Sequence, residues 1–150
     1  MDIRFENREK FKVCGYKIVS DEENFERDVE PLWNKHETEL RKIPESKSCL
    51  YGVTWYKDKT QGLYFYLVGV ETDKPQDDMV CVEVPAAHFI VATIPKGMTR
   101  LEAWWNLPFE DVVPAKGYAP DESHGIYFEF YDKNGNFEIW APVIPMNKQE

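Results

Sequence analysis

One carboxylate of this sequence sits where it could take part in binding or catalysis. Glu129 lies between Phe128 and Phe130. Tyr127 and Tyr131 flank that group on either side. A glutamate covered by aromatic rings loses hydration, and desolvation raises the pKa of a carboxylate. Aromatic faces attract cations, so such a carboxylate suits the role of counter-ion for a lipophilic cation.

The position of this glutamate depends on the hairpin that follows it. The dipeptide Asn134-Gly135 is typical of a two-residue type I′ turn, which would set Glu129 opposite Trp140. Because side chains alternate along a strand, one face of this hairpin then carries the following residues: Tyr127, Glu129, Tyr131, Glu138 and Trp140. We expect this face to point away from the core and the other face, with Phe128 and Phe130, to be buried. A longer loop would shift the register. The alternative interpretation is an exposed sheet face on which Glu129 pairs with a cross-strand lysine.

The remaining elements alternate between strand and helix patterns. Residues 10–19 predict a strand, and apolar residues between 25 and 43 recur at helical spacing. That helix either begins near Pro31 or consists of two segments that meet there. Residues 50–56 and 63–71 predict a hairpin. In the second half we expect the following: a strand region over 79–94 that is bent or broken at Pro85, a helix over 99–113 interrupted by Pro108, a loop over 114–123, and the closing hairpin.

Each half therefore has the order strand, helix, strand, strand, with a polar break at residues 72–78. The pattern predicts an α+β fold of duplicated βαββ units, in which an antiparallel sheet carries two helices and a central ligand groove. We expect a single domain over residues 1–150, with pseudo-repeat halves of about 1–75 and 76–150. Aligning the halves matches Tyr51 and Trp55 with the aromatic residues around Glu129. Two such hairpins facing one another would form a cleft lined with Tyr and Trp.

Composition excludes several classes of function. The chain has 150 residues, 43% of them hydrophobic, and a formal net charge of −9, which disfavours nucleic-acid binding. No segment is apolar enough to span a membrane, and the N-terminus has no signal peptide, so we expect a cytoplasmic protein. The three cysteines have no metal-binding spacing and are expected to be free thiols. No pattern indicates a metal site, a cofactor or a catalytic triad.

Several motifs together resemble a known family. These are PLW at residues 31–33, YGVTWY at 51–56, YFYLVGVE at 64–71, VEVPAAHFIVATIPKG at 82–97, and FEFYD at 128–132 leading to FEIWAPV at 137–143. In order and spacing they resemble the GyrI-like, AraC-type effector-binding domains, especially the stand-alone integron-associated effector-binding proteins. The family usually joins this domain to a helix-turn-helix region, whereas here we expect the domain itself to take up the 150 residues.

The resemblance implies two βαββ units around a groove that binds amphipathic, often cationic, compounds. It implies that Glu129 is the buried glutamate of the family and Tyr131 its tyrosine. It also extends the ligand-binding set to the pocket positions Tyr51, Trp55, Tyr66 and Trp140.

Three functions remain open at this stage. The sequence favours a small-molecule binding module without catalytic residues, because Glu129 is the distinctive group and no second catalytic partner is evident. The alternatives are a hydrolase of small reactive compounds that uses Glu129 as general base, and an inhibitor of the gyrase-modulating kind that binds a protein partner.

Overall fold

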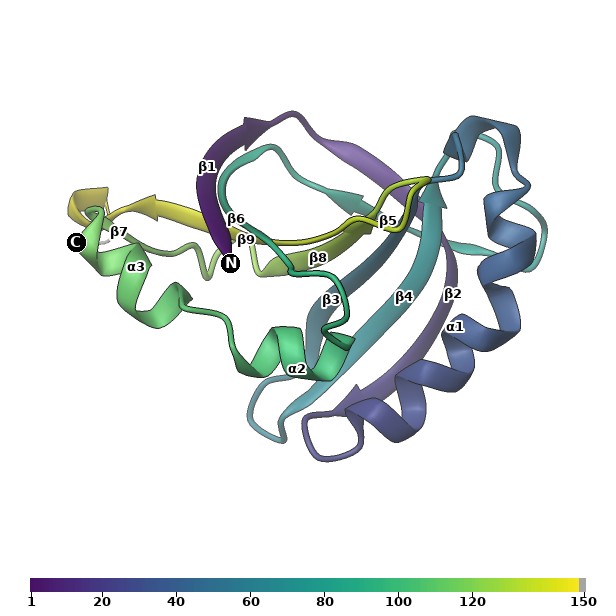
Figure 1. The fold of residues 1–150 in the computed structure, drawn as a ribbon, viewed down its shortest axis with the longest axis horizontal. Coiled ribbons are helices and arrows are strands. Elements are labelled where there is room, and N and C mark those ends of the chain that lie inside the picture. Colours follow the sequence, from purple (N-terminus) through teal and green to yellow (C-terminus); the bar gives the residue numbers. More distant parts are fainter. Residues whose placement is uncertain (149–150) are drawn as a thin grey trace.

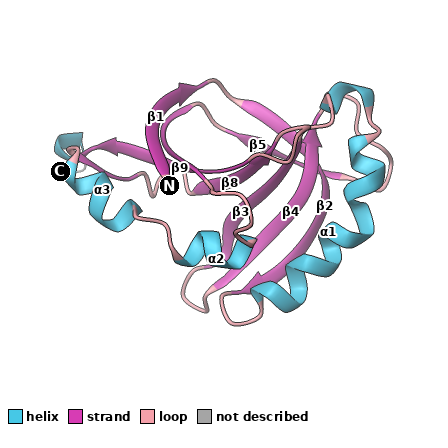
Figure 2. Ribbon diagram, viewed as in Figure 1, coloured by secondary structure: helices cyan, strands magenta, loops and turns pink. Residues whose placement is uncertain are grey.

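One antiparallel sheet organises the chain, and the predicted α+β fold is confirmed. The computed structural model describes residues 1–148, and within them the sheet has nine strands (Figure 1, Figure 2). The strands are β1 (Asp2–Arg8), β2 (Phe11–Asp21), β3 (Leu50–Asp58), β4 (Leu63–Glu71), β5 (Val80–Val84), β6 (Ala87–Thr93), β7 (Tyr118–Pro120), β8 (Ile126–Tyr131) and β9 (Phe137–Pro145). The helices are α1 (Phe25–Arg41), α2 (Arg100–Trp105) and α3 (Phe109–Ala115), with single 3₁₀ turns at Pro44–Ser46 and Met146–Lys148.

The strand order places the two halves of the chain side by side. It runs β1-β6-β9-β8-β3-β4-β2-β5, and β7 pairs with β9. Strands β8 and β3 meet at the centre of the sheet. On the β8 side the next strands are β9 and then β6, and on the β3 side they are β4 and then β2, so the two halves have matching orders. The outermost strands are exchanged, because β1 pairs with β6 and β5 pairs with β2. Pairing therefore crosses between the halves at three places. No helix within residues 1–148 is long and apolar enough to cross a membrane.

Helix α1 is continuous through Pro31, so neither predicted alternative, a start or a junction there, is right. Its buried residues are Phe25, Val29, Trp33 and Leu40, which form one stripe that packs on the sheet beside β2 and β4. A proline inside a helix removes one backbone hydrogen bond. Burial of the stripe outweighs that loss, because each large apolar side chain contributes about 1.5–3 kcal/mol.

The expected second helix is two short helices. Helix α2 ends at Trp105, and α3 begins at Phe109 after Pro108. The break follows from the proline, which disfavours helical geometry in the residue before it. Thr99 and Glu102 form a reciprocal capping box that fixes the start of α2. The short helix α2 lies across the helix-bearing face of the sheet (Figure 1).

The hairpin between β8 and β9 has a longer loop than the predicted two-residue turn. The backbone of Asp132 pairs with Asn136, and Gly135 adopts a positive φ of 79°. The Asp132 carboxylate accepts hydrogen bonds from the backbone N–H groups of Asn134 and Asn136, which stabilises this loop. The register is therefore shifted by one residue, so Glu129 faces Ile139 and not Trp140. A one-residue shift in register moves every side chain of β9 to the opposite face of the sheet. The β9 residues predicted to lie beside Glu129 are therefore the wrong ones.

The predicted orientation of that hairpin is also wrong. The face that carries Glu129 packs against the helices, together with Tyr131 and Ile139. On the opposite face the sheet curls into a second core, where Phe11 of β2 and Phe89 of β6 both contact Phe128 of β8, with ring centroids 5.2 Å and 5.5 Å apart. Both faces of the central strands are thus buried, which the alternating pattern alone does not indicate.

Three smaller expectations also need correction. Residues 2–8 form strand β1, which the sequence did not predict, and the expected loop over 114–123 contains β7. Cys14 and Cys81 lie directly opposite each other on β2 and β5 and form a disulfide, whereas all three cysteines were expected to be free. Only the strand pairing brings together these two residues, which are 67 positions apart. Cys49 is a free thiol.

Candidate functional site

The candidate site is built around Glu129, which has no exposed surface. It lies on β8, which meets β3 at the centre of the sheet, and pairs with Gly52 of β3. Tyr66 lies one strand further on, on β4, and its side chain points to the same face. The carboxylate is therefore enclosed between the middle of the sheet and the helices above it.

Gly52 makes room for this carboxylate. A Cβ atom at that position would lie 2.6 Å from Glu129 Oε1 and closer still to the hydroxyl of Tyr66. Ordinary contacts of a Cβ begin at about 3.4 Å. Any residue larger than glycine would therefore displace the carboxylate or the phenol ring, and glycine is required here for close approach of side chains and not for backbone conformation.

Three side chains donate hydrogen bonds to the Glu129 carboxylate. The hydroxyls of Tyr66 and Tyr131 donate to Oε1 at 2.6 Å and 2.9 Å. The indole N–H of Trp104, from α2, donates to Oε2 at 2.7 Å. Tyr66 in turn accepts a hydrogen bond from the indole of Trp33 at 2.8 Å. Donors from β4, β8 and α2 thus converge on one acid, as expected for a buried charge that must be compensated, and Trp33 of α1 holds one of these donors in place.

Burial raises the pKa of Glu129, while Arg100 and the three hydrogen bonds act in the opposite direction. Burial also raises the pKa of Tyr66 and Tyr131 well above the usual value, and the neighbouring Glu129 adds to the shift. Both phenols therefore keep their protons and remain donors at neutral pH. The site can hold one negative charge, and the protein supplies its stabilising donors.

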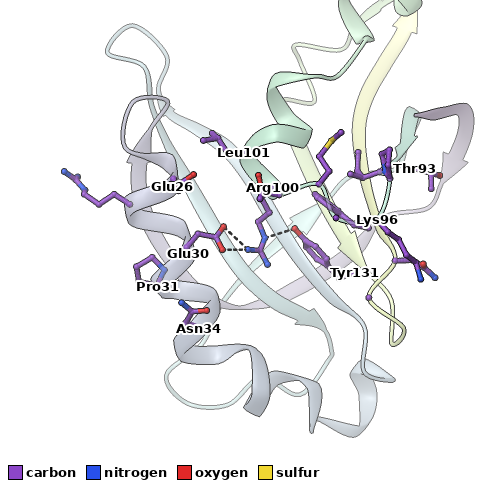
Figure 3. A pocket seen from close by; sticks show the side chains of 18 residues that line it. Glu26, Glu30, Pro31, Asn34, Thr93, Lys96, Arg100, Leu101 and Tyr131 are labelled. Atoms are coloured by element: carbon purple, nitrogen blue, oxygen red, sulfur yellow. Dashed lines mark hydrogen bonds and ion pairs between the residues drawn. The ribbon is translucent and has the colours of Figure 1, made fainter.

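Arg100, the first residue of α2, supplies the nearest positive charge. Its Nε donates to the Tyr131 hydroxyl at 2.7 Å, and its Nη1 contacts both carboxylate oxygens of Glu30 at 2.8 Å and 2.9 Å (Figure 3). Its Nε also lies 3.7 Å from Glu129 Oε1, and its Cζ lies 4.0 Å from the ring centroid of Trp33. The guanidinium is therefore held by aromatic rings and two carboxylates.

Two cavities flank helix α2. The first, of about 910 Å³, lies between α1 and the segment that leads into α2, and its walls include Glu30, Arg100 and Tyr131 (Figure 3). The second, of about 440 Å³, has these aromatic walls: Phe25, Trp55, Tyr56, Tyr64, Trp104, Trp105 and Tyr127. We call them the α1 cavity and the aromatic cavity. Leu101 borders both, and Glu129 lies in the wall of neither, because Arg100 and Trp104 cover it from the two sides.

The predicted site residues fall into two groups. Glu129, Tyr66 and Tyr131 are in direct contact, and Tyr127 lies on the same sheet face, in the wall of the aromatic cavity. Trp55 packs beside Phe65, with ring centroids 5.4 Å apart, and also borders that cavity.

The other two predicted residues are not brought to Glu129. Trp140 stacks on Phe128 in the core on the opposite face, at 5.2 Å between ring centroids. Tyr51 belongs to the same core, where its hydroxyl accepts a hydrogen bond from Arg8.

Sequence reasoning missed four residues of the site: Trp33, Gly52, Arg100 and Trp104. Trp33 is buried and Trp104 is half-buried, and each directs its N–H into the site. A buried tryptophan usually needs a hydrogen-bond acceptor, and that requirement is a signal that could have linked them to a buried glutamate. Arg100 carries no comparable signal, because a basic residue at a helix start is normally exposed. Among residues 1–148, no group of three or more His, Cys, Asp or Glu side chains could hold a metal ion.

The comparison with protein families agrees with this architecture. The family model of Cass2, integron-associated effector binding protein, matches residues 4–143. The chain belongs to this family, and the resemblance of its motifs to effector-binding proteins is confirmed. A protein of this family binds small molecules as effectors. A search among curated proteins gave no match.

Three solved structures illustrate the similarity of fold. An integron cassette protein from the mobile metagenome of Vibrio cholerae, VCH_CASS2, has a TM-score of 0.69 and 18% identity, covering 95% of each chain. SAV2435, solved bound to tetraphenylphosphonium, has a TM-score of 0.73 and 10% identity, covering 100% of this chain and 98% of the other. A hydrolase from Listeria innocua has a TM-score of 0.56 and 11% identity, covering 95% and 91%. At these identities the similarity shows the fold alone.

Proposed function

We propose that this chain binds hydrophobic cations and that Glu129 is their counter-ion. The observation that carries the proposal is a carboxylate without exposed surface, set among aromatic rings and next to two cavities. A buried carboxylate is costly to keep unless a positive charge or hydrogen bonds compensate it. A ligand cation that approached Glu129 would gain the full charge interaction together with the attraction of the rings.

The aromatic cavity suits the apolar body of such a ligand. Its walls combine Trp104, Trp105, Tyr56 and Tyr127, and Trp105 exposes 65% of its surface. Its volume of about 440 Å³ falls within the range of small-molecule sites. The Trp104 indole separates this cavity from Glu129, so a rotation of that side chain would bring the carboxylate within reach of a bound cation.

Two further facts support a cationic ligand. The formal net charge of −9 favours the approach of cations over anions. SAV2435, which has the same fold, was solved bound to tetraphenylphosphonium, a lipophilic cation.

A matched pair of probes tests the proposal. Methyltriphenylphosphonium and triphenylphosphine oxide both carry three phenyl rings on phosphorus, but only the first is charged. We expect the cation to bind wild type more tightly, and Glu129→Gln to weaken cation binding by more than about tenfold, which corresponds to 1.4 kcal/mol. The neutral probe should be affected by less than about threefold. Titration calorimetry would measure the affinities.

Glu138→Gln is the matched control. Glu138 lies on β9, pairs with Arg4 at 2.8 Å and bonds the indole of Trp140, on the sheet face opposite the site. The substitution removes the same formal charge from the same hairpin, so a general effect of net charge would appear in both variants. Equal loss of cation affinity in the two variants, or no loss in Glu129→Gln, would refute the counter-ion role.

The two alternatives have weaker support. A general base needs a free oxygen within reach of the substrate, whereas both oxygens of Glu129 already accept hydrogen bonds and the group borders neither cavity. Consumption of a ligand during the titration would nevertheless favour the hydrolase. A protein-binding inhibitor would use neither cavity, so it predicts no effect of Glu129→Gln on its partner.

A further inference from the structure

The guanidinium of Arg100 lies in surroundings that would suit a cationic ligand. It packs over the Trp33 ring at 4.0 Å and within 5.1 Å of the Tyr131 ring centroid. Two carboxylates, Glu30 and Glu129, lie within 2.8 Å and 3.7 Å of its nitrogens. Aromatic faces combined with carboxylates are how proteins bind cations. In this protein a side chain of the same chain, Arg100, already occupies the position of the cation.

We propose that Arg100 is an internal cation that occupies the cation position beside Glu129, and that a ligand cation binds by displacing it. Arg100 would then determine both the affinity of the site and its preference for charge. The inference rests on the function proposed above, since it concerns the same carboxylate. It adds that the chain competes with its own ligand.

The charges of the site support competition and not simultaneous binding. With Arg100 in place, the guanidinium neutralises Glu129, and a second cation at that carboxylate would lie within a few ångströms of the first. Like charges at such distances repel strongly in a partly desolvated site. The Arg100 side chain is only 15% exposed, so water screens this repulsion poorly.

The structure also has space for the Arg100 side chain once a ligand displaces it from Glu129. Its ion-pair partner Glu30 lies on α1, is 41% exposed, and borders the α1 cavity of about 910 Å³, which Arg100 also borders (Figure 3). The guanidinium can therefore turn away from Glu129 into that cavity while it keeps the Glu30 ion pair. Displacement then leaves no charge unpaired, because the ligand cation replaces Arg100 at Glu129.

The test removes the internal cation. Arg100→Gln removes the charge and keeps an amide that can donate, and Arg100→Met keeps an unbranched stem over Trp33. We expect both variants to bind methyltriphenylphosphonium at least about tenfold more tightly than wild type. Binding of triphenylphosphine oxide should change by less than about threefold. The affinity ratio of the two probes is the readout, because a purely structural role of Arg100 would alter both affinities together.

Two controls separate this effect from others. Arg27→Gln removes the same charge from the wall of the α1 cavity, but Arg27 is exposed and pairs with Asp28, so the affinity ratio should not change. Arg100→Lys keeps the charge, and its cation affinity should stay within about threefold of wild type. In the double variant Arg100→Gln with Glu129→Gln, the gain in cation affinity should disappear.

The outcomes distinguish this inference from the proposed function. If Glu129→Gln weakens cation binding but neither uncharged Arg100 variant strengthens it, the counter-ion role stands and the internal competitor is refuted. If neither wild type nor any Arg100 variant binds the cation, both are refuted. If both uncharged variants unfold, as judged by circular dichroism, Arg100 is a structural ion pair and the inference is also refuted.

Discussion

Replacing Gly52 by alanine tests whether the site is packed as tightly as the structure indicates. The added methyl group would lie 2.6 Å from Glu129 Oε1, and it must separate by about 0.8 Å to reach an ordinary contact of 3.4 Å. The Tyr66 hydroxyl must move as well, because the new Cβ would also collide with it. These two groups form the 2.6 Å hydrogen bond between Tyr66 and Glu129, so the substitution would disturb the central hydrogen bond of the site.

The expected loss of stability has two parts. Crowding a well-packed interior by one methyl group costs about 1–3 kcal/mol. Weakening a hydrogen bond to a buried charged group costs about 1–3 kcal/mol more, because the carboxylate cannot turn to water instead. We therefore expect Gly52→Ala to lower the free energy of unfolding by about 2–6 kcal/mol. That is a large share of the free energy of unfolding of a small domain, which is about 5–15 kcal/mol in total.

Urea denaturation followed by tryptophan fluorescence would measure this loss. Tyr66→Phe provides the control, since it removes the hydroxyl that the new methyl group would meet most closely. If crowding is the cause, the double variant should lose less stability than the sum of the two single losses. A loss below about 0.5 kcal/mol in Gly52→Ala, or strict additivity in the double variant, would refute the reasoning.

Two further predictions concern pH and the halves of the chain. The pKa of Glu129 is raised in the folded state, so the folded protein binds this proton more tightly than the unfolded chain does. The free energy of unfolding of wild type should therefore fall as the pH rises from the ordinary pKa of glutamate through the raised pKa. Glu129→Gln should lack this fall, and parallel plots of unfolding free energy against pH for the two proteins would contradict the assignment. A fragment of residues 1–75 should not fold as a stable monomer, because β1, β2 and β3 each lose a partner strand from the second half. A cooperative thermal transition of the monomeric fragment would contradict this prediction.

The local patterns of the sequence predicted most of the elements. The strands over 50–56 and 63–71 were identified with bounds within a few residues of β3 and β4, because both segments are rich in apolar, aromatic and β-branched residues and a polar loop joins them. Proline placed two of the breaks correctly, at Pro85 and Pro108, since it lacks the N–H that both strands and helices need. At Pro31 the same rule failed, because buried contacts with the sheet keep α1 continuous.

The sequence also singled out Glu129, because an acid within an aromatic strand is unusual whichever face it occupies. It could not determine that face. The register of β8 and β9 depends on a loop closed by the side chain of Asp132, and one residue of difference exchanged Trp140 for Ile139. Only the tertiary structure decided which groups meet the carboxylate, since Tyr66 comes from β4 and both Trp104 and Arg100 come from α2. Their convergence depends on how the helices cross the sheet, and no local spacing encodes that arrangement.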